Sequence, residues 1–99
     1  MNLTESQKKV LRGLGHNLKP VITVGDAGLS ESLMKEFEST IAHHELIKVR
    51  IRASDREQRD ATIAELCERG TANLVTRIGN VALLFRPNAE KPRIVIPSA

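Results

Sequence analysis

Two glycines separated by two residues, Gly25 and Gly28, mark the strongest candidate binding site in this 99-residue chain. They follow the β-branched run Val21-Ile22-Thr23-Val24 and precede Ser30, which is a suitable N-cap for a helix. A glycine pair between a strand and a helix allows positive φ angles and lets another backbone approach closely. The free amides and positive dipole end of the helix suit a phosphate. The loop Gly25-Asp26-Ala27-Gly28 therefore predicts an anion site, of the kind with which KH domains clamp nucleic-acid backbone.

The spacing of this loop excludes two other phosphate-binding motifs. It is too short for a Walker A loop, whose Lys-Ser/Thr pair is missing, and it lacks the third glycine of a dinucleotide-binding fingerprint. A tight turn that binds nothing remains the alternative, because short motifs often match by chance. Asp26 favours that alternative, since it places a negative charge beside the expected phosphate.

Basic residues support the nucleic-acid interpretation. Ile47, Val49 and Ile51 alternate with three cations, which predicts a strand with one apolar and one purely cationic face. Three like charges on one strand face repel one another, and they are useful where a polyanion binds. The candidate RNA-contacting cations are those of this strand, the lysine before the first strand and those of the first helix, namely Lys48, Arg50, Arg52, Lys19, Lys8, Lys9 and Arg12.

Composition limits the class of protein and the mode of recognition. The formal net charge is +3, and the only aromatic residues are Phe37 and Phe85. Because bases usually stack on aromatic rings, we expect recognition of backbone or shape rather than of base identity. A single cysteine, Cys67, fits a reducing compartment, and neither an apolar leader nor a membrane-spanning run is present in the sequence. These features predict a cytoplasmic protein.

No group of residues predicts catalysis or metal binding. His43-His44-Glu45 contains two adjacent histidines that point in different directions, so we interpret them as groups at a helix C-terminus. Glu65 and Glu68 lie three residues apart on an expected helix and are interpreted as solvated, not as an acid–base pair. We therefore predict that the protein is not an enzyme and uses no metal, cofactor or small-molecule substrate.

Capping signals and apolar spacing predict three helices. The first is expected to begin with the capping box of Thr4 and Gln7. The third is expected to begin with a second capping box, Ser54 and Glu57, and to be capped at its C-terminus by Gly70. The apolar stripe of the first helix consists of Val10, Leu11 and Leu14.

Four strands complete the expected fold, with a hairpin turn at Gly79-Asn80 between strands 73–78 and 81–86. The order α-β-α-β-α-β-β predicts an α/β fold, a single compact domain with a four-stranded mixed sheet. Crossovers through the second and third helices should give parallel pairs, and the hairpin should be antiparallel. Residues 1–99 are expected to form one domain, in which 88–99 is an extended C-terminal tail that could dock as an extra strand.

Several segments resemble the YhbY-like CRM domain proteins. The matching segments are Leu18-Lys19-Pro20-Val21, Gly25-Asp26-Ala27-Gly28-Leu29, His43-His44-Glu45-Leu46-Ile47-Lys48-Val49, Arg77-Ile78-Gly79 and Leu84-Phe85-Arg86-Pro87. The resemblance spans essentially the whole chain and implies an RNA-binding domain similar in fold to the C-terminal domain of translation initiation factor three. It implies that the glycine loop contacts RNA and that Lys48 lies on the basic surface. Single-domain bacterial members of the family associate with precursors of the large ribosomal subunit.

The leading hypothesis is a monomeric RNA-binding protein, with no membrane partner, that contacts rRNA phosphates during assembly of the large ribosomal subunit. One alternative is a protein-interaction adaptor that uses the acidic second helix to contact ribosomal proteins or a translation factor. The other is a small enzyme for nucleotides or phosphate metabolites, for which the sequence offers no convincing base or metal.

Overall fold

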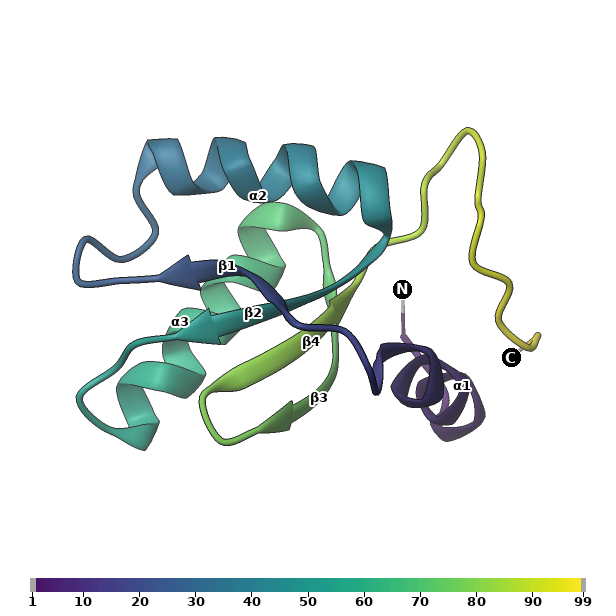
Figure 1. Ribbon diagram of the computed structural model, residues 1–99, viewed down its shortest axis with the longest axis horizontal. Helices are drawn as coiled ribbons and strands as arrows, with labels where there is room; N and C mark the ends of the chain where they lie inside the picture. Colours follow the sequence, from purple (N-terminus) through teal and green to yellow (C-terminus); the bar gives the residue numbers. More distant parts are fainter. Residues whose placement is uncertain (1, 99) are drawn as a thin grey trace.

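The computed structural model describes residues 2–98, and their helices and strands follow the predicted order (Figure 1). This confirms the predicted fold class, a single compact α/β domain with a four-stranded mixed sheet. The elements are α1 (Glu5–Gly15), β1 (Pro20–Val24), α2 (Glu31–His44), β2 (Leu46–Ile51), α3 (Arg56–Gly70), β3 (Asn73–Ile78) and β4 (Val81–Phe85).

The strand order is β1-β2-β4-β3, with β1 parallel to β2 and both remaining neighbour pairs antiparallel. The prediction of a second parallel pair is wrong, because β4 lies between β2 and β3. Burial gives the physical reason: Ala82 to Phe85 of β4 are buried on both faces, which requires a central strand. Leu74 and Ile78 of β3 are exposed and suit an edge.

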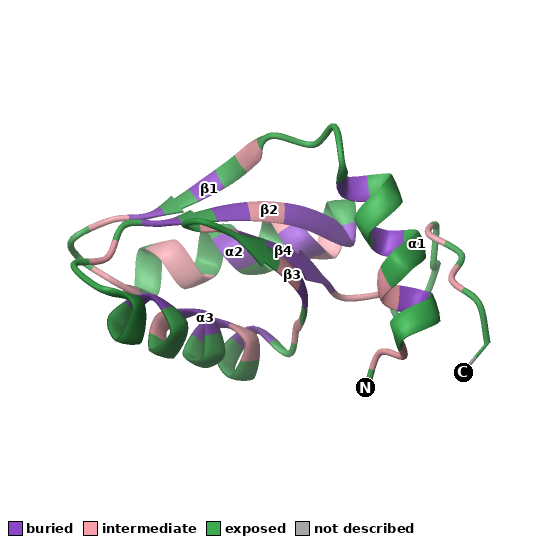
Figure 2. Ribbon diagram, turned by 90° about the horizontal axis from the view of Figure 1, so that it is seen from below, coloured by how far each residue is buried: buried purple, intermediate pink, exposed green. Residues whose placement is uncertain are grey.

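The two faces of the sheet are covered unequally (Figure 2). Helices α2 and α3 cover one face, and Phe37, Ile41, Ile63 and Leu66 form the main core with the strands there. Helix α1 covers only one end of the other face, where Leu11 contacts a second cluster of Leu46, Val75, Leu83 and Phe85. The remainder of that face carries no helix.

The ends of α3 differ from the predicted ones by one residue each. The Ser54–Glu57 capping box is wrong: Asp55 is the N-cap and accepts a 2.8 Å hydrogen bond from the Gln58 amide. Gly70 is not the C-cap but the last helical residue, and Thr71 follows it in the left-handed region with φ 51°. The glycine is needed for packing, because a Cβ on Gly70 would collide with the Phe37 ring.

The capping box of α1 is confirmed, but its predicted apolar stripe is wrong at two of three positions. Leu11 is buried, whereas Val10 and Leu14 are exposed. The buried stripe is Gln7, Leu11 and Gly15. Gln7 is buried because its side-chain amide donates a 2.8 Å hydrogen bond to the carbonyl of Pro97, 90 residues away.

The C-terminal tail docks on the domain, but as irregular chain and not as the extra strand considered above. Glu45 organises it. This fully buried carboxylate accepts hydrogen bonds from the backbone N–H groups of Asn88 (2.7 Å), Arg93 (3.0 Å) and Ile94 (3.0 Å). Ile94 and Ile96 then contact the second cluster.

Two carboxyl groups have lowered pKa values. Burial raises the pKa of Glu45, but the three backbone N–H donors stabilise the ionised form more, so the net pKa lies below the ordinary value of 4.5. The hydrogen bond from the Arg86 guanidinium lowers the pKa of Glu38. A lowered pKa stabilises the folded state above the ordinary value, and this contribution is lost as the pH falls through the folded-state pKa.

We predict that Glu45→Gln lowers the free energy of unfolding at pH 7 by about 1–3 kcal/mol, because an amide cannot replace a carboxylate that accepts three hydrogen bonds. Urea denaturation at a series of pH values measures this. The difference from wild type should shrink as the pH falls below the ordinary carboxyl pKa of 4.5 and through the lowered pKa of Glu45, where this side chain itself becomes protonated. Glu90→Gln, on the exposed part of the tail, is the control and should have no effect. A difference that stays constant with pH would contradict the assignment.

We predict opposite effects of alanine at two helical glycines. Gly70→Ala should destabilise the protein by about 1–3 kcal/mol, because the new methyl group meets the Phe37 ring. Gly13→Ala should stabilise it by up to about 1 kcal/mol, because a Cβ there meets open space and alanine favours a helix. Thermal denaturation of both variants measures this, and equal effects at the two sites would refute the packing role of Gly70.

Candidate nucleic-acid interface

The parallel pairing of β1 and β2 places the ends of both strands at one edge of the sheet. Thr23 pairs with Arg50 and Val24 with Ile51. Just beyond the pairing, the Arg52 amide donates a 2.9 Å hydrogen bond to the carbonyl of Val24. The segment after β2 is therefore held beside the loop that follows β1.

The glycine loop is a tight turn between β1 and α2. The Gly28 amide donates a 2.9 Å hydrogen bond to the Gly25 carbonyl, and Asp26 and Ala27 are exposed at the tip. Ser30 is the N-cap of α2, as predicted, and its hydroxyl accepts a 3.1 Å hydrogen bond from the Leu33 amide. The turn therefore leads directly into the N-terminus of α2.

The two glycines have different roles in this turn. Gly28 has a φ of +66°, which strains any residue with a Cβ. Gly25 does not have a positive φ, and a Cβ there would meet nothing within 4 Å. The protein's own packing does not require a glycine at position 25. Because Gly25 has no side chain, the end of β1 is left open to the approach of another molecule.

A cleft of about 590 Å³ lies between the loop and the segment after β2. Gly25, Asp26 and Gly28 line one side, and Arg52 lines the other. Polar residues that the sequence reasoning missed complete the lining, namely Ser54, Gln58 and Thr62. These residues follow β2 or lie on the first turns of α3, and this position could have indicated that they line the cleft. Using that signal requires knowing that β1 and β2 end at the same edge of the sheet.

Three further predicted cations lie together on the uncovered part of the sheet. Lys19, Lys48 and Arg50 line a groove of about 290 Å³, whose other lining residues are Leu18, Pro20, Thr76, Ile78, Val81 and Leu83. We call it the open-face groove. Lys48 Nζ also donates a 3.4 Å hydrogen bond to the His16 carbonyl just after α1, which positions its side chain at one end of the groove.

The α1 cations lie apart from the loop. In Figure 1, α1 and the loop after β1 are at opposite ends of the long axis, which extends 37 Å. Lys9 and Arg12 are exposed there, and Lys8 is 3.9 Å from the Glu5 carboxylate. The structure thus brings Arg52 to the loop and groups Lys19, Lys48 and Arg50 in the groove, whereas the helix that carries Lys8, Lys9 and Arg12 lies at the other end of the molecule from the loop.

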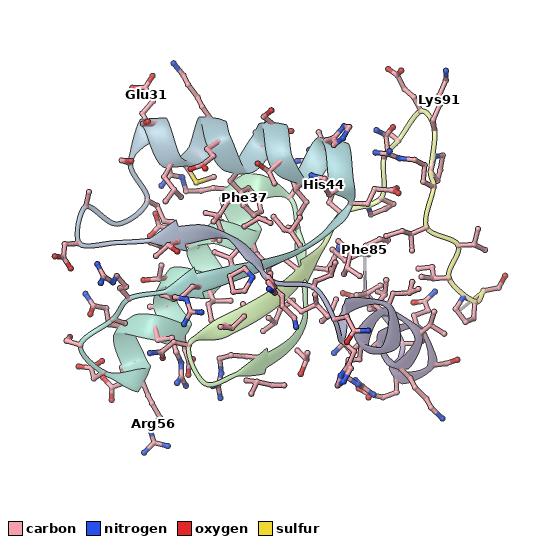
Figure 3. All side chains as sticks on the ribbon, viewed as in Figure 1. Glu31, Phe37, His44, Arg56, Phe85 and Lys91 are labelled. Atoms are coloured by element: carbon pink, nitrogen blue, oxygen red, sulfur yellow. The ribbon has the colours of Figure 1, made fainter. Side chains whose placement is uncertain are left out.

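The charges around the cleft and groove are available to a ligand. Within residues 2–98, Lys19, Arg50 and Arg52 take part in no ion pair, whereas Arg69 and Arg86 are paired with glutamates. Figure 3 shows Arg56, the first residue of α3, pointing into solvent at the loop end of the molecule. Asp26 is the one carboxylate lining the cleft, and it opposes the binding of an anion.

The described part of the chain contains no group of three or more His, Cys, Asp or Glu residues that could hold a metal ion. The pair His43 and His44 ends α2, as interpreted from the sequence, with the two rings in an edge-to-face arrangement. No helix among residues 2–98 is long and apolar enough to cross a membrane.

Comparisons with known proteins agree in fold and in sequence. A family model described as the CRS1 / YhbY (CRM) domain matches residues 3–86. A Pseudomonas aeruginosa protein named "Probable RNA-binding protein" is 43% identical over 88 residues, covering 89% of this chain and 85% of the relative. An "RNA-binding protein" of Haemophilus influenzae is 39% identical over 95 residues, covering 96% and 95% of the two chains.

A solved structure extends the comparison. It is the solution structure of a hypothetical Staphylococcus aureus protein described as a candidate RNA binder. It superposes with a TM-score of 0.82 at 31% identity, and the match covers 97% of this chain and 100% of the other.

Proposed function

Because this chain belongs to the CRS1/YhbY (CRM) domain family, as its resemblance predicts, we propose that it binds structured RNA through the cleft between the glycine loop and Arg52. One observation carries the proposal: parallel strand pairing places the glycine turn, with open space above Gly25, on one side of a cleft and Arg52 on the other. The Arg52 guanidinium has no ion-pair partner within residues 2–98. The names of the relatives, which describe RNA-binding proteins and not enzymes, support RNA as the ligand.

The cleft suits a phosphate backbone for two physical reasons. The absent side chain at Gly25 leaves room for a ribose-phosphate chain to approach the turn, as in other loops of this spacing. The guanidinium of Arg52 presents a planar fork of donors that matches the oxygens of a phosphate. Binding of this kind positions an RNA without reading its sequence.

The cations of β2 extend the interface away from the cleft. Lys48, Arg50 and Arg52 alternate along the chain, so their side chains leave the same face at intervals of about 7 Å. A row of charges at this spacing neutralises successive parts of a polyanion and releases its counterions. The proposed interface therefore runs from the glycine loop along β2 towards the C-terminal end of α1.

We predict that changing Lys48, Arg50 and Arg52 together to Gln weakens binding to a fluorescently labelled RNA hairpin and reduces its salt dependence. Each lost phosphate contact should reduce the slope of log K against log salt by about 0.7–0.9. Fluorescence anisotropy over a salt series measures this.

A matched control and an opposite charge change sharpen this test. Lys91→Gln removes an exposed cation far from the loop and should leave the slope unchanged (Figure 3). Asp26→Asn removes the negative charge from the cleft and should tighten binding. An unaltered slope in the triple variant would refute the interface.

The RNA that we propose is rRNA in precursors of the large ribosomal subunit, where the protein would act during assembly without catalysing a reaction. The support is the full-length resemblance to single-domain bacterial members of the family. In the cell, ultraviolet crosslinking followed by sequencing should recover large-subunit rRNA with the wild-type protein and less of it with the triple variant. An adaptor that binds ribosomal proteins would instead keep its partner after nuclease treatment, and that result would contradict the proposal.

A further inference from the structure

The open-face groove has an apolar floor that the fold leaves uncovered. Five aliphatic residues line it, and they come from both edges and the interior of the sheet: Leu18, Pro20, Ile78, Val81 and Leu83. Ile78 is 78% exposed and Leu18 is 40% exposed. Large aliphatic side chains gathered on an exposed surface indicate a contact with another molecule.

The rim of this groove is cationic. Lys19, Lys48 and Arg50 are its charged lining residues, and no carboxylate lines it. Thr76 provides the only side-chain hydroxyl. The occupant should therefore combine a flat or compact apolar part with nearby negative charge.

We propose that the open-face groove holds an unpaired RNA nucleotide, with its base on the aliphatic floor and its phosphates against Lys19, Lys48 and Arg50. The inference rests on the proposed function and deepens it. A groove of this kind would make the protein prefer RNA with a bulged or looped-out nucleotide to a continuous duplex. The scarcity of aromatic residues makes this an aliphatic platform, to which Arg50 adds a guanidinium plane on which a base can stack.

The size of the groove favours a single nucleotide over a longer segment. Its volume of about 290 Å³ lies just below the range, from about 300 Å³ upward, of pockets that hold drug-sized ligands. With only one hydroxyl in the lining, the groove offers few hydrogen bonds to distinguish one base from another. It should therefore accept an unpaired base of any identity.

One row of alternating cations links the groove to the proposed phosphate-binding cleft. Lys48 and Arg50 line the groove, and Arg52, the next residue on the same side of the chain, lines the cleft. One RNA strand can follow this row of cations and place a base in the groove while its backbone lies at the glycine loop. An acidic peptide could bind the same cations, but it has no ribose-phosphate backbone to place at the glycine loop.

Three hairpins of the same sequence test the inference. The first is fully paired, the second carries one bulged nucleotide, and the third carries an abasic residue at the bulge with the same phosphates. The wild-type protein should bind the intact bulge about fivefold more tightly than the abasic one, the lower end of the gain from stacking a base on an aromatic ring. Fluorescence anisotropy at constant salt gives this ratio.

A groove variant and a matched control complete the experiment. Leu18→Ser with Ile78→Ser removes two exposed side chains, so the fold should be retained, as circular dichroism would show. The ratio should fall to about one while affinity for the paired hairpin is unchanged. Val95→Ser removes an aliphatic side chain that is 85% exposed on the tail and should leave the ratio at the wild-type value.

Methyl NMR gives an independent readout of the same contact. Ring currents from a bound base should shift the methyl signals of Ile78, Val81 and Leu83 with the intact bulge and not with the abasic one. Equal binding of the two bulged hairpins, or unshifted methyl signals, would overturn the inference and leave the proposed function standing. Failure of the wild-type protein to bind any of the hairpins would refute the proposed function itself.

Discussion

The candidate interface depends on the parallel pairing of β1 with β2. Two parallel strands end at the same edge of a sheet, so whatever follows each of them must meet there. The hydrogen bond from the Arg52 amide to the Val24 carbonyl extends this pairing and holds the start of one loop against the end of the other strand. Had β1 run antiparallel to β2, the glycine turn would have emerged at the opposite end of the sheet, away from Arg52. The interface is therefore a consequence of topology as much as of the Gly-x-x-Gly spacing.

Unequal coverage of the sheet gives the molecule one basic side. Helices α2 and α3 cover one face, and the exposed surface of α2 carries Glu31, Glu36 and Glu38. The other face is covered only at the end where Leu11 contacts Leu83 and Phe85. A net charge of +3 understates this arrangement, because Lys19, Arg50 and Arg52 have no acidic partner among residues 2–98, whereas Glu31 and Glu38 are paired with Lys35 and Arg86. A polyanion approaching the protein is therefore attracted to the uncovered strands.

Local signals made much of the fold predictable, and long-range contacts account for the errors. The β2 alternation, the Ser30 cap and the Gly79-Asn80 turn each depend on neighbouring residues, and each is confirmed. Two other features depend on contacts between distant parts of the chain, which hydrophobic periodicity cannot indicate. One is the position of β4 between β2 and β3, and the other is the buried hydrogen bond of Gln7 with Pro97. The candidate site divides in the same way. The loop and the strand cations could be chosen from sequence. Only packing shows that Arg52 lies beside the loop, that α1 lies apart from it and that an apolar groove is left open.

The contacts of Glu45 with the tail show that the folded domain and the segment matched by the family model end at different residues. The match to the family model ends at residue 86, yet all three backbone donors to this carboxylate come from Asn88, Arg93 and Ile94. A chain trimmed at the end of that match would leave a buried negative charge without its partners and would uncover the apolar surface beneath Ile94 and Ile96. The folded domain is therefore longer than the segment that the family model matches, and a fragment designed from that match alone would begin with a defect in its core.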